Sequence, residues 1–199
     1  MATNKQAGMI ELPELRVNRI QLTLIGDSPL IVHQFGQKAR QAMRDKDEGR
    51  AMSGKEPRDA EQEYLDSMYF TDDGKPGFPA IAFKAAAVSA ANDAGIQKVL
   101  ARRAFHVVGE IIPIYGNPAM RWDIVRIGMG TSTNRYRAEF KQWSVSLTIV
   151  YNAGIISLEQ LINLFAIAGF GVGVGVWRPE RDGTYGTFHV ANESDVTHA

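Results

Sequence analysis

The stretch from Gly169 to Val190 combines bare backbone with an aromatic ring and permanent cations. At its start four glycines alternate with larger apolar residues, so an extended segment would carry no side chain on one of its faces. These glycines are Gly169, Gly171, Gly173 and Gly175. Trp177, Arg178 and Arg181 follow them. Bare amides beside an aromatic face and arginines suit the binding of a single-stranded nucleic acid, which we expect here.

Two glycine-containing nucleotide motifs do not fit this stretch. A Rossmann motif follows a strand and opens a helix, whereas this loop follows the helix candidate SLEQLINLFAIA (157–168) and leads into a strand. A P-loop would end in GK[ST], which is missing. The other interpretation is a glycine hinge, or a packing surface without a ligand.

Residues that could do catalysis are few. The chain has no cysteine and no serine-nucleophile motif. Asp27 and His33, which follow the first predicted strand, are the candidates for a metal-independent ribonuclease, but an Asp in a GDSP turn is typical of an Asx turn. Asp72 and Asp73 belong to another turn. No metal-ligand spacing links the histidines, which are His33, His106, His189 and His198. We therefore expect no enzyme, no metal and no cofactor.

The charges are balanced overall but unevenly placed. Formal net charge is zero, so the whole-protein field does not favour a polyanion. Between positions 97 and 143, however, eight Lys or Arg face three acidic residues, an excess of five positive charges. The excess indicates either a nucleic-acid surface or a solvated face. No apolar run reaches the ~18 residues of a membrane span, and no signal peptide is evident, so we expect a cytoplasmic protein.

Hydrophobic periodicity predicts an α+β fold in one domain, residues 1–199. Stripped of two insertions, the element order is βαββαβ, a ferredoxin-like (RRM-like) core. The core strands are predicted at 16–25, 105–116, 142–152 and 184–191, and the core helices at 79–95 and 157–168. The remaining parts are an N-terminal arm (1–15), an insertion with two short helices (26–78), a β-hairpin (116–141) and a polar tail (192–199).

Two segments and the order of the elements resemble the RAMP superfamily, which includes the repeated backbone subunit of CRISPR effector complexes. GFPAIAFKAAAVSAA (77–91) is similar to the turn and first helix of that family, and GFGVGVGVWRPERDGTYGTF (169–188) is similar to its glycine-rich loop. Those backbone subunits also carry a large insertion after the first strand and a hairpin "thumb" between the second and third strands. The chain resembles a stand-alone relative of the sort found in phages and prophages.

The resemblance implies a homo-oligomer whose copies lie side by side along RNA or single-stranded DNA as a filament. The hairpin of one copy would reach the next. Neither phosphate neutralisation nor base stacking depends strongly on sequence, so we expect little sequence preference. By this analogy Tyr136 is a stacking or wedge residue, and the other thumb residues are Arg126, Arg135 and Arg137. The groove would be lined by Lys84, Trp177, Arg178 and the amides of Gly171, Gly173 and Gly175.

Two further functions stay open at this point. In the first, the glycine loop and the hairpin contact other protein subunits, and the protein is a structural assembly protein without nucleic acid. In the second, Asp27 or His33 makes the protein a ribonuclease. Self-association is expected from both the binding and the assembly functions, so oligomeric state alone does not separate them.

Overall fold

The structure is a computed structural model that describes residues 15–34, 41, 44–45, 47–49, 59–127, 130–192 and 195. The predicted N-terminal arm, the first helix of the insertion and most of the polar tail lie outside these residues. The described part has four α-helices and antiparallel sheets, so the prediction of a mixed fold of helices and sheets is confirmed.

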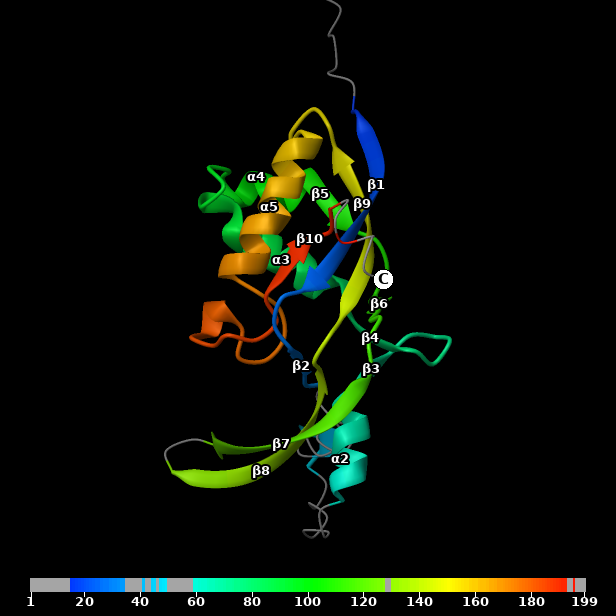
Figure 1. The fold of residues 1–199 in the computed structure, drawn as a ribbon, viewed down its shortest axis with the longest axis vertical. Coiled ribbons are helices and arrows are strands. Elements are labelled where there is room, and N and C mark those ends of the chain that lie inside the picture. The colour runs from blue at the N-terminus through cyan, green and yellow to red at the C-terminus, as the bar shows by residue number, and fades with distance from the viewer. Residues whose placement is uncertain are drawn as a thin grey trace, which may run out of the picture.

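The largest sheet has four antiparallel strands in the order β10, β1, β9, β5. Their bounds are β10 Phe188–Val190, β1 Val17–Gly26, β9 Ser144–Asn152 and β5 Phe105–Val107. The helices α3 (Ala80–Ser89) and α5 (Leu158–Gly171) pack on one face of this sheet, with α4 (Lys98–Ala104) beside them (Figure 1). The chain thus passes through a helix layer between β1 and β5, and again between β9 and β10.

Alternation of apolar and polar residues places the core on the helix side of the sheet. In β1, Leu22 and Leu24 are buried while Arg19, Gln21 and Thr23 are exposed, as expected of a half-buried strand. The buried face of β9 comprises Val145, Leu147, Ile149 and Tyr151. Large aromatic residues from helices and strands fill the space between the layers, among them Phe83, Phe105, Phe165 and Phe188.

Local sequence signals set the start of α5, and a close tertiary contact lies near its other end. The Ser157 hydroxyl accepts from the Gln160 amide at 3.2 Å while the Gln160 side chain accepts from the Ser157 amide at 2.9 Å, which is the predicted capping box. The helix then continues through Gly171, so the extended conformation predicted for the first glycines is wrong. A Cβ on Gly169 would overlap the carbonyl oxygen of Phe188, so this glycine lets α5 pack directly on β10.

The predicted boundaries between α3 and the hairpin need correction. Pro79 is the N-cap of α3 and not its first residue, and the helix ends at Ser89, before a 3-10 turn, η1 (Ala90–Asn92). α4 was not predicted. The strand predicted at 105–116 is two strands in different sheets, β5 and β6 (Ile111–Pro113). The small sheet that contains β6 also contains β3 (Tyr69–Phe70) and β4 (Pro76–Pro79), which the loop 71–75 joins. The turn was predicted at DDGKPG (72–77), so it covers most of this loop but wrongly includes the first two residues of β4.

The predicted hairpin is confirmed, as β7 (Pro118–Ile127) and β8 (Thr131–Phe140). β2 (Leu30–Val32) pairs with β8 on its other side, and α2 (Ala60–Asp66) packs against β8. The hairpin extends away from the main sheet on the same side as the loop that follows α5 (Figure 1). Its side chains therefore divide into a face toward that loop and an outer face.

Candidate nucleic-acid interface

An open cleft of about 600 Å³ lies between α3, α4 and the loop that follows α5. Four basic side chains from three segments of the chain line it, namely Lys84 on α3, Lys98 and Arg102 on α4, and Arg178 on the loop. Its volume is in the range of pockets that hold small organic ligands or parts of larger ones. The cleft therefore concentrates positive charge on a protein whose formal net charge is zero.

Apolar side chains form much of the remaining wall. They come from α3, from the loop that follows α5 and from the small sheet of β3, β4 and β6. These side chains are Ile81, Val88, Val172, Val174, Tyr69 and Phe78. Ile81 is 68% exposed although its neighbours on α3 are largely buried. Cations beside an apolar wall can accept a phosphate together with a sugar or base.

The glycine loop, defined here as residues 172–187, is held in place by hydrogen bonds to α5 and β2. The amide of Gly173 donates to the Ala168 carbonyl at 2.8 Å, and that of Val176 donates to the Ile31 carbonyl at 3.0 Å. Gly173 and Gly175 both have positive φ, 67° and 81°. A Cβ on Gly175 would lie 2.6 Å from the Ile31 carbonyl oxygen, so packing requires glycine there. The glycines thus serve close packing, and the loop presents Gly173 and Gly175 to the cleft.

Polar contacts orient two of the predicted cations. Arg178 donates to the Gly175 carbonyl at 3.2 Å and to Glu180 at 2.7 Å. Glu180 also accepts from the Ser89 hydroxyl at 2.6 Å, and these bonds, the one from Ser89 foremost, lower the pKa of the Glu180 carboxyl. Lys84 lies 3.2 Å from Nδ1 of His106 on β5. Lys84 and Arg178 are therefore held at the cleft by neighbouring strands and turns.

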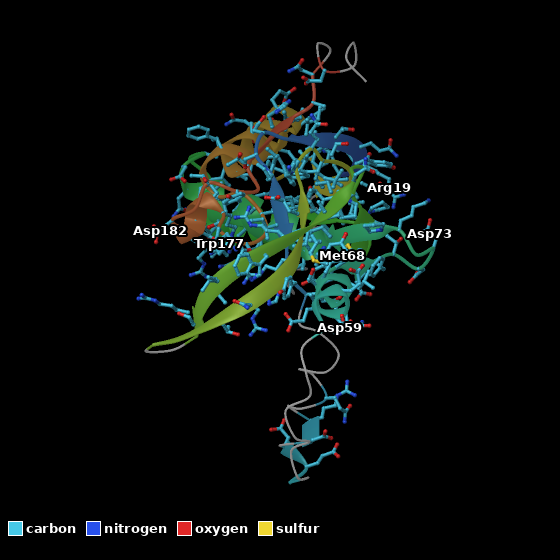
Figure 2. The ribbon with its side chains drawn as sticks, turned by 60° about the horizontal axis from the view of Figure 1, so that its bottom comes forward. Arg19, Asp59, Met68, Asp73, Trp177 and Asp182 are labelled. Carbon is cyan, nitrogen blue, oxygen red and sulfur yellow. The ribbon has the colours of Figure 1, made fainter. Side chains whose placement is uncertain are left out.

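Trp177 lies at the root of the hairpin and not in the cleft lining (Figure 2). The guanidinium groups of Arg121 and Arg137 lie 5.5 and 5.2 Å from its ring centre. Asp123 is 8% exposed and pairs with Arg121 at 2.9 Å and with Arg137 at 3.7 Å. Trp177 has a left-handed backbone, φ 55°. These contacts fasten the hairpin to the glycine loop.

The predicted thumb residues do not share one face of the hairpin. Arg137 is 7% exposed and packs inward, and burial lowers its pKa, opposed by Asp123. Arg126 and Tyr136 lie at positions of the outer face, where Trp122 is the cross-strand partner of Tyr136 and is 57% exposed. Met120 and Ile124 continue this exposed apolar row. Arg135 pairs across the strands with Asp123, so it belongs to the inner face.

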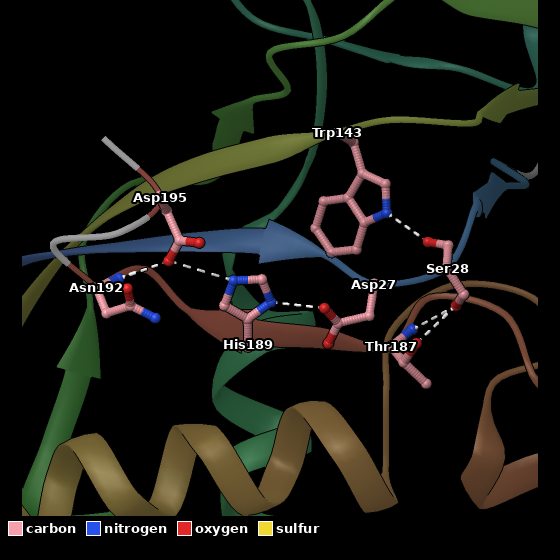
Figure 3. Close-up of polar contacts among 7 residues, drawn as sticks. All are labelled: Asp27, Ser28, Trp143, Thr187, His189, Asn192 and Asp195. Carbon is pink, nitrogen blue, oxygen red and sulfur yellow. Dashed lines mark hydrogen bonds and ion pairs between the residues drawn. The ribbon is translucent and has the colours of Figure 1, made fainter. Parts of the chain in front are cut away.

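Asp27 and His33 have different surroundings. His33 lines the cleft, and partial burial lowers its pKa, with the charges of Arg137 and Arg135 acting in the same direction. Asp27 lies 2.6 Å from Nδ1 of His189 on β10, and Nε2 of that ring lies 3.4 Å from Asp195 (Figure 3). Strand pairing of β1 with β10 brings Asp27 and His189 together, and their separation of 162 residues hid this contact from sequence reasoning.

The structure brings together four of the predicted site residues, Lys84, Gly173, Gly175 and Arg178, around one cleft. Gly171 is the last residue of α5 and lies outside the cleft lining, as do the hairpin residues. Sequence reasoning missed the cleft roles of Lys98, Arg102, Ser89 and Glu180. A lysine and an arginine four positions apart were the available signal, because this spacing places both on one face of a helix.

Two features are absent from the part of the chain that the structure describes. No group of three His, Cys, Asp or Glu side chains there is placed to hold a metal ion. None of the helices there is long and apolar enough to cross a membrane.

Comparison with known proteins gives a similarity in structure but none in sequence. No model of a known protein family matches the chain, and no curated protein matches it in sequence. A crystal structure of Cmr6 from Pyrococcus furiosus superposes with a TM-score of 0.45 and 11% sequence identity, covering 89% of this chain and 100% of that one.

Proposed function

We propose that this protein binds single-stranded nucleic acid without cutting it. The observation that carries the proposal is the cleft, where Lys84, Lys98, Arg102 and Arg178 converge from three segments beside an apolar wall. Cations neutralise backbone phosphates, and apolar or aromatic surface accepts sugars and bases, which are the two elements of single-strand binding.

The same arrangement predicts weak sequence preference. Lysine and arginine at phosphates position a strand but carry no sequence information. The apolar wall offers contact that every base can make. We therefore expect single strands of different sequence to bind with similar affinity, whether the natural partner is RNA or DNA.

The arrangement of the main sheet and the hairpin supports a further part of the proposal, namely that copies of the protein associate along the strand. We infer that the β10, β1, β9, β5 sheet with α3 and α5 is a ferredoxin-like core, because its strands alternate in direction and its two crossovers each contain a helix. The element order supports a RAMP-like domain, with β7 and β8 as the thumb. Copies would associate side by side along the strand, with Arg126, Arg135 and Tyr136 of the hairpin near the strand or the next copy.

One observation favours a second function, that of an assembly protein. Met120, Trp122 and Ile124 are 42%, 57% and 64% exposed on alternating positions of β7. Such an apolar row is suited to a protein partner as well as to bases. In that case the hairpin would contact another subunit, and the cleft cations would remain solvated.

Size-exclusion chromatography with ultraviolet absorbance separates the two functions. If the proposal is right, the freshly purified protein elutes as a large species with a high 260-to-280 nm absorbance ratio. Nuclease and high salt should then lower the absorbance ratio and shrink the species. The nucleic acid extracted from untreated protein should show no cleavage caused by the protein. A large species that carries no nucleic acid and is unaffected by nuclease would favour the assembly function.

A further inference from the structure

We propose that the cleft contains a defined phosphate position between the Ser89 hydroxyl and the Arg178 guanidinium, and that the carboxylate of Glu180 fills it in the free protein. A bound strand would place a phosphate there and displace Glu180. The anion's identity as a backbone phosphate rests on the proposed function. The position itself rests on the contacts of Glu180.

Glu180 joins the two sides of the cleft. It belongs to the 3-10 turn η2 (Pro179–Arg181) of the glycine loop, and its Oε1 accepts from Ser89 on α3 at 2.6 Å. Its Oε2 accepts from Nε and Nη2 of Arg178 at 3.1 and 2.7 Å. One carboxylate thus satisfies a hydroxyl and both donors of a guanidinium fork.

The donors around this carboxylate also suit a phosphate. Nε and Nη2 of Arg178 converge on one carboxylate oxygen, and an oxygen of a phosphate can accept the same two hydrogen bonds. The Ser89 hydroxyl can donate to either anion. Glu180 therefore marks a place where an anion fits. The lowered pKa of Glu180 agrees with a carboxylate that stays charged at this point.

The contact between Glu180 and Arg178 is exposed enough for a phosphate to replace the carboxylate. The side chains of Arg178 and Glu180 are 29% and 35% exposed, and ion pairs that reach solvent contribute little to stability. Lys98 and Arg102, which line the same cleft, would attract a phosphate as it enters. A strand gains contacts with several cations at once, whereas the Glu180 carboxylate contacts only Arg178 and Ser89 in the described residues.

This inference predicts that Glu180→Gln strengthens binding. Removing one negative charge within a few ångströms of a phosphate should tighten the complex about fivefold. Arg178 meets the same phosphate in both proteins, because the strand displaces Glu180 in the unaltered protein, so the slope of log affinity against log salt should change little. Fluorescence anisotropy of a labelled mixed-sequence oligonucleotide measures both quantities.

Two controls isolate the effect. Glu110→Gln removes the same charge from an exposed residue outside the cleft lining, and we expect it to leave affinity within about twofold. In an Arg178→Gln background, Glu180→Gln should tighten binding less than it does alone, because no guanidinium is freed. Thermal melting checks the fold, and Glu180→Ala removes the same charge if the glutamine variant melts early.

The binding measurements distinguish failure of the phosphate position from failure of nucleic-acid binding itself. If the unaltered protein binds the oligonucleotide and Glu180→Gln weakens that binding or leaves the affinity unchanged, Glu180 serves to position Arg178 and the inference is wrong. If the unaltered protein does not bind at all, the proposed function itself is wrong, and the phosphate position is rejected with it.

Discussion

Replacing Lys98 and Arg102 together with glutamine should weaken single-strand binding about 25-fold at about 0.1 M salt. Both side chains line the cleft from one face of α4, and both are at least partly exposed. For a single strand each neutralised phosphate contributes about 0.7 to the salt slope, so the loss of two should reduce the slope by about 1.4. Anisotropy titrations at several salt concentrations measure this directly.

The matched control for this pair is Arg19→Gln with Arg103→Gln. Arg103 is the exposed neighbour of Arg102 on α4, and Arg19 is exposed on β1, and neither lines the cleft. The control removes the same net charge from the protein. Equal loss of affinity in the two double variants would mean that binding follows overall charge and not the cleft.

Replacing Gly169 with alanine should lower the free energy of unfolding by about 3 kcal/mol. The new Cβ would overlap the carbonyl oxygen of Phe188 and meet its ring, and a backbone atom cannot move aside as a flexible side chain can. The expected result is separation of α5 from β10, at an edge of the main sheet. Urea denaturation followed by circular dichroism measures the change.

Gly171→Ala is the control for that substitution. Gly171 belongs to the same helix, has no neighbour within 4 Å of an added Cβ and no positive φ. Alanine is a better helix former than glycine, so we expect unchanged stability or a gain of up to about 1 kcal/mol. Similar losses in both variants would contradict the assigned packing of α5 on β10.

Short-range signals predicted the elements whose causes are local, and they missed α4 and the division of 105–116 into β5 and β6. The alternation in 16–25 and the Ser157 capping box depend on neighbouring residues, and both are present in the structure. The alternation of glycines after Ala168 was misleading. Gly169 and Gly171 lie in α5, and what explains Gly169 is its approach to Phe188, a contact made only when β10 joins the sheet.

The candidate site was partly predictable for the same reason. Residue type singled out Gly173, Gly175 and Arg178, and the resemblance to the RAMP superfamily added Lys84. The fold places all four at one cleft. Arg137 and Trp177 were also predicted to contact nucleic acid, but they pack on each other at the root of the hairpin. That contact, and the one between Ser89 and Glu180, join segments far apart in the sequence, so residue spacing could not indicate them.

The salt dependence of single-strand binding by the unaltered protein tests the central claim most directly. The four cleft cations together with Arg126 and Arg135 would neutralise about six phosphates, which gives a slope near −4.2, so a fourfold increase in salt should weaken binding ~300-fold. A labelled mixed-sequence strand and anisotropy detection are sufficient. A slope near zero, or no binding at low salt, would contradict a cleft that holds the nucleic-acid backbone.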